Sequence, residues 1–332
     1  MTGTELEPGT ELTPDTVVAY LQHRGLLDPA IPAIVGRLAG GVSNDVLAVR
    51  AGPRNIVVKQ ALAQLRVEAD WHADPDRILT EAAALRLAGE IRGGAVPPVL
   101  DVDAAAHVLV IGRAPETFRL WKDDLMAGQV VPAVPRRLGE LLAAWHSATA
   151  SRPELTRPFA GTDAFVELRI DPFYRATALA NPDLRTTIDS LADRLLTEPI
   201  CLVHGDFSPK NVLTGPDGVW VLDWEVAHLG DPTFDLAFLI SHLLCKAIYR
   251  PESDFRIAAE EFLAAYRSAA FDLPDRDGAY LAAQTACLVL ARVDGKSPVD
   301  YLDPAARRRA RECARAGLRS ALTDPLELWE LL

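Results

Sequence analysis

Apolar residues follow two spacings along this chain of 332 residues, and each spacing predicts one kind of element. Short apolar runs bounded by Gly, Pro, Asn or Asp predict buried strands. Apolar residues three and four positions apart predict helices. The strands are predicted at 46–50, 55–59, 108–111, 199–203 and 219–222, and the longer helical patterns lie at 138–145, 236–248, 255–270, 279–292 and 304–322. The stretch 93–100 lies between the strands predicted at 55–59 and 108–111. It contains two Gly and two Pro and is predicted to be a loop.

Three further signals mark helix starts, each a polar capping residue followed by proline. These are Thr13-Pro14, Asp74-Pro75 and Asp231-Pro232. The first of these helices is predicted to end near Gly25. Residues 1–12 ahead of it are rich in Thr, Glu, Gly and Pro and offer little apolar surface to bury. We therefore expect 1–12 to be disordered.

The stretch 202–235 holds the side chains best suited to catalysis. Asp206 and Asn211 follow one predicted strand, and Asp223 and Glu225 follow the next. Polar groups at the ends of strands lie on a rigid scaffold, which is where chemistry is usually placed. Carboxylate and amide oxygens suit Mg²⁺, which takes one or two carboxylates together with substrate phosphates. The alternative is a chance cluster of turn-forming residues.

The same stretch matches the motif of a known family. It reads His204-Gly205-Asp206, four residues, Asn211, and then Asp223-x-Glu225. This pattern resembles the aminoglycoside phosphotransferase-like family of small-molecule kinases, and every motif position is filled. The resemblance implies an α+β, two-lobed, protein-kinase-like fold. A small β-rich N-lobe that binds the nucleotide is expected over 13–112, and a larger, mainly helical C-lobe that carries the catalytic and acceptor sites over 113–332.

Two segments of the expected N-lobe are suited to binding phosphate. Gly40-Gly41-Val42-Ser43-Asn44 precedes a strand, and such a turn points backbone N–H groups at an anion, although ordinary hairpin turns use the same residues. Lys59 ends a buried strand, where its ammonium needs a partner. Glu81, beside the apolar stripe of the following helix, is the predicted partner. A solvated lysine on an edge strand is the alternative. Both segments are most similar to methylthioribose kinases.

The resemblance also implies roles in the reaction. Asp206 is expected to accept the proton of the acceptor hydroxyl or to orient that hydroxyl. Asn211 and Asp223 are expected to hold Mg²⁺, with Glu225 assisting directly or through water. Lys59, tethered by Glu81, is expected to steady the phosphates of ATP, under the glycine-rich turn.

Two residues are expected to support the catalytic loop and not to act on the substrate: His204, and Asp235 in the first turn of its helix. His146, next to Trp145, is interpreted as a core histidine and not as a base. The predicted hinge between the lobes reads Gly112-Arg113-Ala114-Pro115 where many relatives carry an acid, so the choice between ATP and GTP stays open.

The acceptor site is less defined. The loop after the helix at 279–292 carries Arg292, Asp294 and Lys296, which are candidate acceptor-binding residues, and a solvated turn is the alternative. A protein substrate is not expected, because Gly205 stands where protein kinases have arginine. The preferred acceptor is a hydroxyl of a sugar or sugar-like alcohol. An aminoglycoside is the alternative, and a catalytically inactive nucleotide-binding protein is the alternative from another class.

Composition limits the kinds of binding partner and the cellular compartment that we expect for this chain. A net charge of −12, from 34 Lys and Arg against 46 Asp and Glu, argues against a nucleic-acid partner. It is compatible with a cationic substrate or with a generally acidic surface. The four cysteines are scattered without a Cys-x-x-Cys pair, which favours reduced thiols in the cytoplasm over disulfides or zinc. The polar start at 1–15 and the lack of a long apolar run predict neither a signal peptide nor a membrane span, and the oligomeric state is left open.

Overall fold

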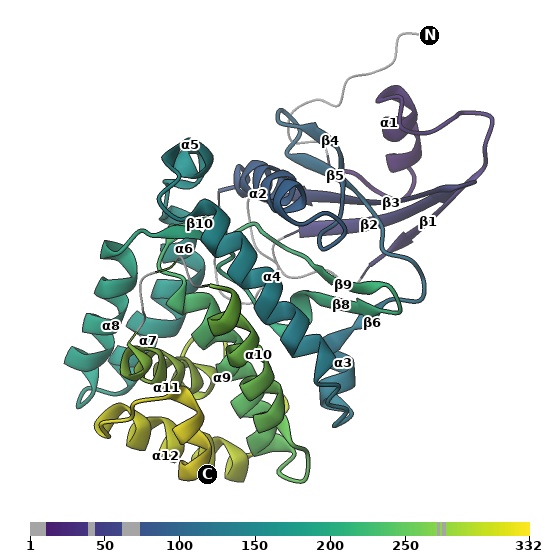
Figure 1. The fold of residues 1–332 in the computed structure, drawn as a ribbon. Helices are drawn as coiled ribbons and strands as arrows, with labels where there is room; N and C mark the ends of the chain where they lie inside the picture. Colours follow the sequence, from purple (N-terminus) through teal and green to yellow (C-terminus); the bar gives the residue numbers. More distant parts are fainter. Residues whose placement is uncertain (1–10, 39–43, 62–73, 271–272, 274–276) are drawn as a thin grey trace.

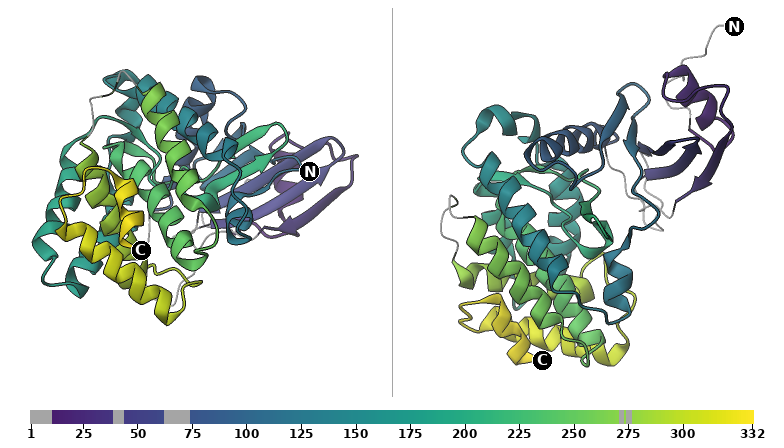
Figure 2. Two further views of the ribbon diagram at one scale, coloured as in Figure 1. Left: turned by 60° about the horizontal axis from the view of Figure 1, so that its bottom comes forward. Right: turned by 45° about the vertical axis from the view of Figure 1, so that its right-hand side comes forward.

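The protein consists of a sheet-rich lobe and a helical lobe, as Figure 1 and both views of Figure 2 show. The computed structural model describes residues 11–38, 44–61, 74–270, 273 and 277–332. The first lobe is built on one five-stranded antiparallel sheet in the order β1-β2-β3-β5-β4. Its strands are β1 (Ala33–Arg37), β2 (Asn44–Ala51), β3 (Arg54–Ala61), β4 (Val99–Asp103) and β5 (Val108–Gly112).

The two-residue side-chain period of β3 decides which residues reach the site. Ile56 and Val58 pack in a buried cluster with α1 (Val17–His23). Val57 faces the other way, into the main core that includes α2 (Arg77–Ile91). Lys59 shares the face of Val57 because it lies two residues further on. The strand therefore turns the lysine towards α2 and the second lobe.

The second lobe is mainly helical and surrounds a central buried helix, α9 (Thr233–Tyr249). Almost every side chain of α9 is buried, and α10 and α11 pack against it. The other long helices are α4 (Ala133–Thr149), α8 (Arg185–Thr197), α10 (Phe255–Ala269), α11 (Gly278–Asp294) and α12 (Pro304–Arg319). The shorter helices are α3 (Trp121–Met126), α5 (Pro153–Thr156), α6 (Asp163–Phe165) and α7 (Ala176–Ala180), with a π-helical segment η2 (Val166–Arg175) and three 3₁₀ turns, η1 (Arg157–Phe159), η3 (Pro209–Asn211) and η4 (Pro325–Leu331).

Two small sheets lie where the lobes meet. One pairs β7 (Cys201–Val203) with β10 (His228–Gly230), and the other has the order β6-β8-β9. Its strands are β6 (Arg119–Leu120), β8 (Val212–Gly215) and β9 (Gly218–Val221). The predicted catalytic loop runs from the end of β7 to the start of β8, so both of its ends are fixed by sheet pairing.

The α+β class, with a β-rich N-lobe and a helical C-lobe, is confirmed. The predicted strands and long helices are present, with shifts of a few residues at their ends. The prediction of a loop over 93–100 is wrong at its end, because Val99 and Leu100 begin β4. Strand β1 was not predicted. The helices expected directly after Thr13-Pro14 and Asp74-Pro75 begin later, at Val17 and Arg77.

Part of the segment 1–12 also needs correction. Residues 1–10 lie outside the described part of the chain. Leu12, in contrast, is 1% exposed and packs in the cluster around α1. Its backbone N–H donates to the buried Gln60 side chain at 2.7 Å. The ordered lobe therefore includes Leu12.

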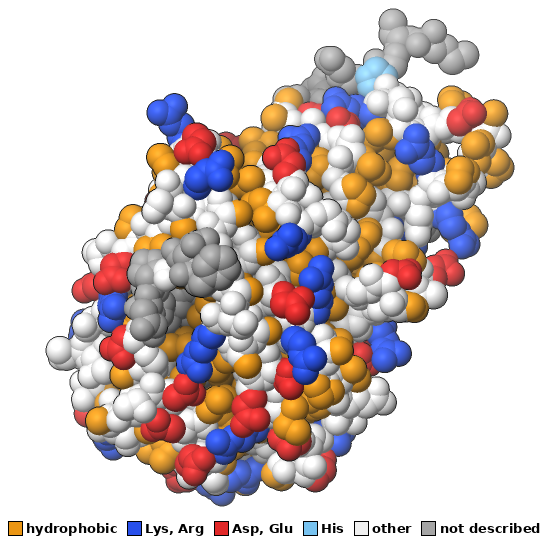
Figure 3. Space-filling model, in the orientation of Figure 1, with side chains coloured by type: hydrophobic (Ala, Val, Ile, Leu, Met, Phe, Trp, Pro, Cys, Tyr) orange, Lys and Arg blue, Asp and Glu red, His pale blue; other side chains and the backbone are white. Residues whose placement is uncertain are grey.

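The surface carries mixed charge. Figure 3 shows Lys and Arg side chains beside Asp and Glu across one face. Ion pairs between such side chains are short: Arg136–Glu261 is 2.8 Å and Arg137–Glu140 is 3.0 Å. In the described ranges, none of the helices combines the length and the apolar character that crossing a bilayer requires.

Helices α4 and α10 approach closely at Gly139, and this contact positions part of the site described below. A Cβ on Gly139 would collide with the carbonyl oxygen of Phe262 and lie 2.9 Å from the backbone nitrogen of Tyr266.

We expect Gly139→Ala to lower the free energy of unfolding by about 1–3 kcal/mol, because the two backbones must separate. Urea unfolding measures this. Gly161→Ala is the control, since a Cβ there meets nothing within 4 Å. Equal stability of the two variants would contradict the close packing of α4 on α10.

Candidate active site

Asp235, in the first turn of α9, holds the loop that follows β7. Its carboxylate accepts hydrogen bonds from the backbone N–H groups of His204 at 2.7 Å and Gly205 at 2.9 Å. Gly205 has φ +78°, and a Cβ there would lie 2.6 Å from the carbonyl oxygen of Val226. This position therefore favours glycine for two reasons, conformation and space.

A buried histidine completes the anchor. His146 Nε2 lies 3.3 Å from Asp235 Oδ2, and its Nδ1 lies 2.9 Å from the Tyr266 hydroxyl. Both His146 and Asp235 are fully buried. Burial raises the pKa of Asp235, but the hydrogen bond and charge of His146 outweigh it, so the net pKa is lowered. His146 is thus a core residue, as the sequence predicted, and α4 and α10 together hold it in place.

Asp206 lies in the same loop, between two cations. Arg169 Nη2 is 3.1 Å and Lys210 Nζ 2.8 Å from its Oδ2. Burial raises the pKa of Asp206, but Arg169 and Lys210 outweigh it and the net pKa is lowered. The carboxylate is therefore ionised at neutral pH. Within the described residues no side chain bonds Oδ1, which is therefore the oxygen available to a substrate hydroxyl.

Arg169 was not singled out from the sequence. It lies on η2, 37 residues before Asp206, and its Nε also donates to the carbonyl oxygen of Gly205 at 2.6 Å. No local motif marks it. Its role follows only from the folding of η2 against the catalytic loop.

The loop is closed on its other side by Asn211 and the end of β9. Asn211 Nδ2 donates to the Asp206 carbonyl at 3.0 Å, which directs its Oδ1 away from that bond. The Leu222 N–H donates to the Asn211 carbonyl at 2.8 Å, and the Leu222 carbonyl lies 3.0 Å from His204 Nε2. The next residue, Asp223, has φ +66°, a left-handed conformation that is strained for a residue other than glycine. These hydrogen bonds thus fix the positions of Asn211 and Asp223 relative to each other.

Lys59 joins the lobes. Its Nζ lies 2.6 Å and 2.7 Å from the Glu81 carboxylate oxygens and 2.8 Å from Asp223 Oδ1. Strand β3 lies between β2 and β5, so the alternative of a solvated edge lysine is wrong. Burial lowers the pKa of Lys59, but Asp223 and Glu81 outweigh it and the net pKa is raised. Burial likewise raises the pKa of Asp223, while Lys59 and Lys210 lower it overall.

Glu225 has a partner that was not predicted. Its Oε2 accepts from Arg77 Nε at 3.1 Å, and both side chains are nearly enclosed. Arg77 is the first residue of α2, so a second ion pair joins the lobes beside the first.

The donor set fits a nucleotide-bound Mg²⁺ better than a metal held by protein alone. No group of three or more His, Cys, Asp or Glu suited to a metal occurs among the described residues. Asn211 Oδ1 and the Asp223 carboxylate are hard oxygen donors, and phosphate and water oxygens usually complete a Mg²⁺ shell.

The other predicted site residues lie outside the described part of the chain or in separate surroundings. Gly40, Gly41 and Ser43 lie outside the described residues, and Asn44 begins β2. Asp294 is bound by Arg311 at 2.6 Å and by Asn181 at 3.2 Å, so its carboxylate is already occupied. Lys296 is exposed, whereas Arg292 is half-buried, with its guanidinium carbon 5.4 Å from the ring centroid of Phe173 in η2.

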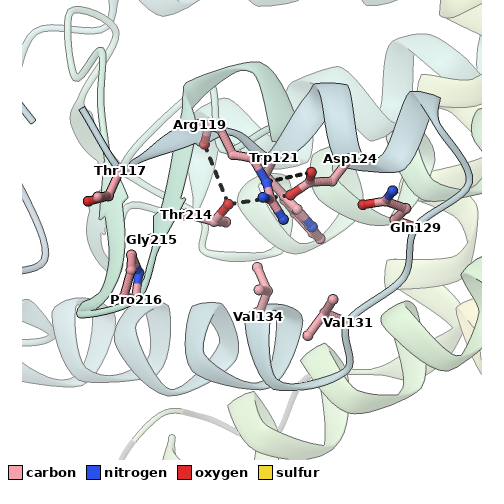
Figure 4. Close-up of a pocket in the computed structure, with 10 residues that line it drawn as sticks. All are labelled: Thr117, Arg119, Trp121, Asp124, Gln129, Val131, Val134, Thr214, Gly215 and Pro216. Atoms are coloured by element: carbon pink, nitrogen blue, oxygen red, sulfur yellow. Dashed lines mark hydrogen bonds and ion pairs between the residues drawn. The ribbon is translucent and has the colours of Figure 1, made fainter. Parts of the chain in front are cut away.

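A separate pocket of about 290 Å³ lies between β6, the β8–β9 turn and α4 (Figure 4). Arg119 and Asp124 pair across it at 2.7 Å. Its ten lining residues include none of the site residues expected from the sequence. The chemistry described above therefore does not belong to this pocket.

A model of the phosphotransferase enzyme family (APH) matches residues 35–281, well over half of the chain. The chain belongs to this family. The matched region contains the catalytic loop, Lys59 and both interlobe ion pairs, and the family assignment made from the motif is confirmed.

Relatives of this phosphotransferase support the same class. Methylthioribose kinase from Bacillus cereus (strain AH820) is 27% identical over 267 residues, covering 73% of this chain and 68% of the relative. A choline/ethanolamine kinase family protein from Mesorhizobium loti has the same fold, with a TM-score of 0.56, 20% identity and coverage of 96% and 98%. Choline kinase LicA from Streptococcus pneumoniae gives 0.54, 18% identity and coverage of 92% and 98%. The phosphotransferase is thus a small-molecule kinase.

Arg77→Met should lower the free energy of unfolding by about 3–5 kcal/mol, because it removes the cation from a buried carboxylate. Adding Glu225→Gln should restore part of this loss, since the buried charge is then gone as well. Urea unfolding of both variants measures the effect. Arg86→Met, on the exposed side of α2, is the control and should stay within about 0.5 kcal/mol of the wild type. A Glu225→Gln addition that destabilises further would contradict the pairing.

Proposed function

We propose that this phosphotransferase moves the γ-phosphoryl group of ATP, with Mg²⁺, onto a hydroxyl of a sugar or sugar-like small molecule. The observation that supports this most is the placement of an ionised Asp206, with Oδ1 unbonded, in the loop that also positions Asn211 and Asp223. An acceptor hydroxyl at Oδ1 would face a nucleotide held by Lys59. The family and the similarity to methylthioribose kinase support the same reaction.

The step balances without any further reactant. The acceptor oxygen forms a bond to Pγ while the bond from Pγ to the oxygen bridging the β-phosphate breaks. The hydroxyl proton passes to Asp206 Oδ1 and then to solvent, and the products are ADP and a phosphate monoester. Because such transition states are loose, positioning and charge neutralisation contribute more than proton removal.

Each residue of the site then has one task. Lys59, fixed by Glu81, would exchange its contact with Asp223 for the non-transferred phosphates. Asn211 and Asp223 would hold the metal, which neutralises charge on the phosphates when bound. Glu225 is assigned to support, through Arg77, and not to direct coordination. We assign the nucleotide to the lobe of 13–112, with Gly40, Gly41, Ser43 and Asn44 over the phosphates, and catalysis to 113–332.

Asp206→Asn should lower kcat by about 10²–10⁴-fold, the range typical of losing a general base, while nucleotide binding changes little. An ADP-release assay gives the rate. The rise in melting temperature with an ATP analogue reports binding. Asp217→Asn, in the exposed β8–β9 turn, is the matched control and should behave as the wild type. Near-normal turnover by Asp206→Asn would refute the proposed mechanism.

Asp223→Asn should raise the Mg²⁺ concentration needed for half-maximal rate by at least the ~10–100-fold that follows loss of a residue supporting a metal ligand. Glu225→Gln should raise it much less, because Arg77 already occupies that carboxylate. Magnesium titrations at fixed ATP measure both. Equal effects of the two substitutions would show that Glu225 is a direct ligand.

A further inference from the structure

Cationic side chains gather next to Asp206 around two phenylalanines that meet edge to face. Phe173 of η2 and Phe238 of α9 pack with ring centroids 5.6 Å apart. Arg169 lies 6.0 Å from the Phe173 centroid and 5.7 Å from the Phe238 centroid. Arg292 lies 5.4 Å from the Phe173 centroid. Since Arg169 also contacts the catalytic carboxylate, this group adjoins the position of the acceptor hydroxyl.

Lys246 extends the group along α9. It lies two steps of four residues beyond Phe238, with His242 between them, and residues four apart lie on one face of a helix. It is 2% exposed, and its Nζ lies 5.5 Å from the Tyr301 ring centroid. Its ammonium makes neither a hydrogen bond nor an ion pair with a described residue. Its pKa is lowered to about 8, mainly by burial and also by Arg292, with Cys245 opposing.

The hydrogen-bond donors of the Arg292 guanidinium are also only partly satisfied. Its Nη1 donates to the Ser297 carbonyl at 2.9 Å, but its enclosed Nε has no hydrogen-bond partner within the described ranges. Asp294, two residues on, does not neutralise it, because Arg311 and Asn181 occupy that carboxylate. We call Arg169, Lys246 and Arg292 the cationic cluster.

The titratable groups next to the cluster do not neutralise Lys246 or Arg292. His242 packs on Phe238 with ring centroids 5.1 Å apart and makes no hydrogen bond to a described residue. Burial lowers its pKa well below the usual range, and Arg292 and Lys246 lower it further, so this imidazole is neutral. Asp206 is the nearby acid, and it is already bound by Arg169 and Lys210.

Arg169 has Asp206 as its carboxylate partner. Lys246 and Arg292, in contrast, form no ion pair with a described residue, and such buried cationic groups are unfavourable in the free protein. Their cost is offset if a ligand brings an anion to them. We propose that the acceptor alcohol carries an anionic oxygen group, a carboxylate or a phosphate, which binds Lys246 and Arg292 while the hydroxyl reaches Asp206. This inference rests on the proposed kinase function and names its substrate class. Polycationic acceptors such as aminoglycosides are excluded by the same charges.

The first test is an ADP-release assay with matched acceptors: D-gluconate against D-sorbitol, and D-ribose 5-phosphate against D-ribose. Choline and kanamycin serve as cationic acceptors. In at least one pair the anionic member should have a kcat/KM about 10–100-fold higher than its neutral partner, the range expected for a hydrogen bond to a charged group. The pair that responds tells a carboxylate from a phosphate. Equal or better use of neutral or cationic acceptors would overturn the inference while leaving the kinase function intact.

The second test does not require a turned-over acceptor. With Mg²⁺ and a non-hydrolysable ATP analogue present, inorganic phosphate and gluconate are compared with chloride at equal ionic strength. At least one of the two anions should raise the melting temperature of the wild type more than chloride does, and Lys246→Met should lose this response. Lys296→Met, an exposed lysine of the neighbouring loop, should keep it. An unchanged response in Lys246→Met, or no response in the wild type, would overturn the inference.

Lys246→Met also separates a binding role from a structural one. Without added anion, this variant should melt at a higher temperature than the wild type, because an unpaired buried charge has been replaced by an apolar side chain of similar length. A lower melting temperature would assign Lys246 to structural support and contradict the proposal. If Asp206→Asn kept full activity, the kinase mechanism itself would fail, whatever the response of Lys246.

Discussion

The buried carboxylate of Asp235 is the interaction on which the rest of the site depends. An ionised carboxylate in a closed interior is tolerated only where several donors satisfy it. Here two are backbone N–H groups of the catalytic loop and one is His146, itself held by Tyr266. Helices α4, α9 and α10 therefore all fix the start of this loop. A shift of any of them would move Asp206, although none of the three helices carries that residue.

The two lobes are joined by charges that also serve the proposed reaction. Lys59 pairs with Asp223 and Arg77 with Glu225, each across the boundary between the sheet-rich and helical parts. In that reaction the first pair would exchange, with Asp223 holding the metal and Lys59 the phosphates. The second pair would remain as a link between the lobes. Under this proposal, the link between the lobes and the binding of the nucleotide use neighbouring but separate ion pairs.

Sequence reasoning found the residues that lie in a compact motif and missed those that depend on tertiary approach. Asp206 and Asn211 were found because strand ends and spacing mark them locally, and Glu81 because it lies beside a helical stripe. Arg169 and Arg77 carry no such mark, since their partners are 37 and 148 residues away in the chain. Strands β1 and β4 were not predicted because they mix apolar with polar positions. Lys246 lies within a largely apolar helix, and no local pattern marks it.

The net charge of the chain differs in sign from the charges around Asp206. A net charge of −12 suggested at most a cationic substrate, yet the groups nearest Asp206 are Arg169 and Lys210. Much of the acid lies on the surface in ion pairs that solvent screens, whereas the enclosed cations act in a medium of lower dielectric constant. The same cations keep Asp206 ionised and therefore make it a weak base. In the proposed phosphoryl transfer this is a small loss, because a positive field at the transferred group stabilises its charge, and that field would also favour the proposed anionic acceptor.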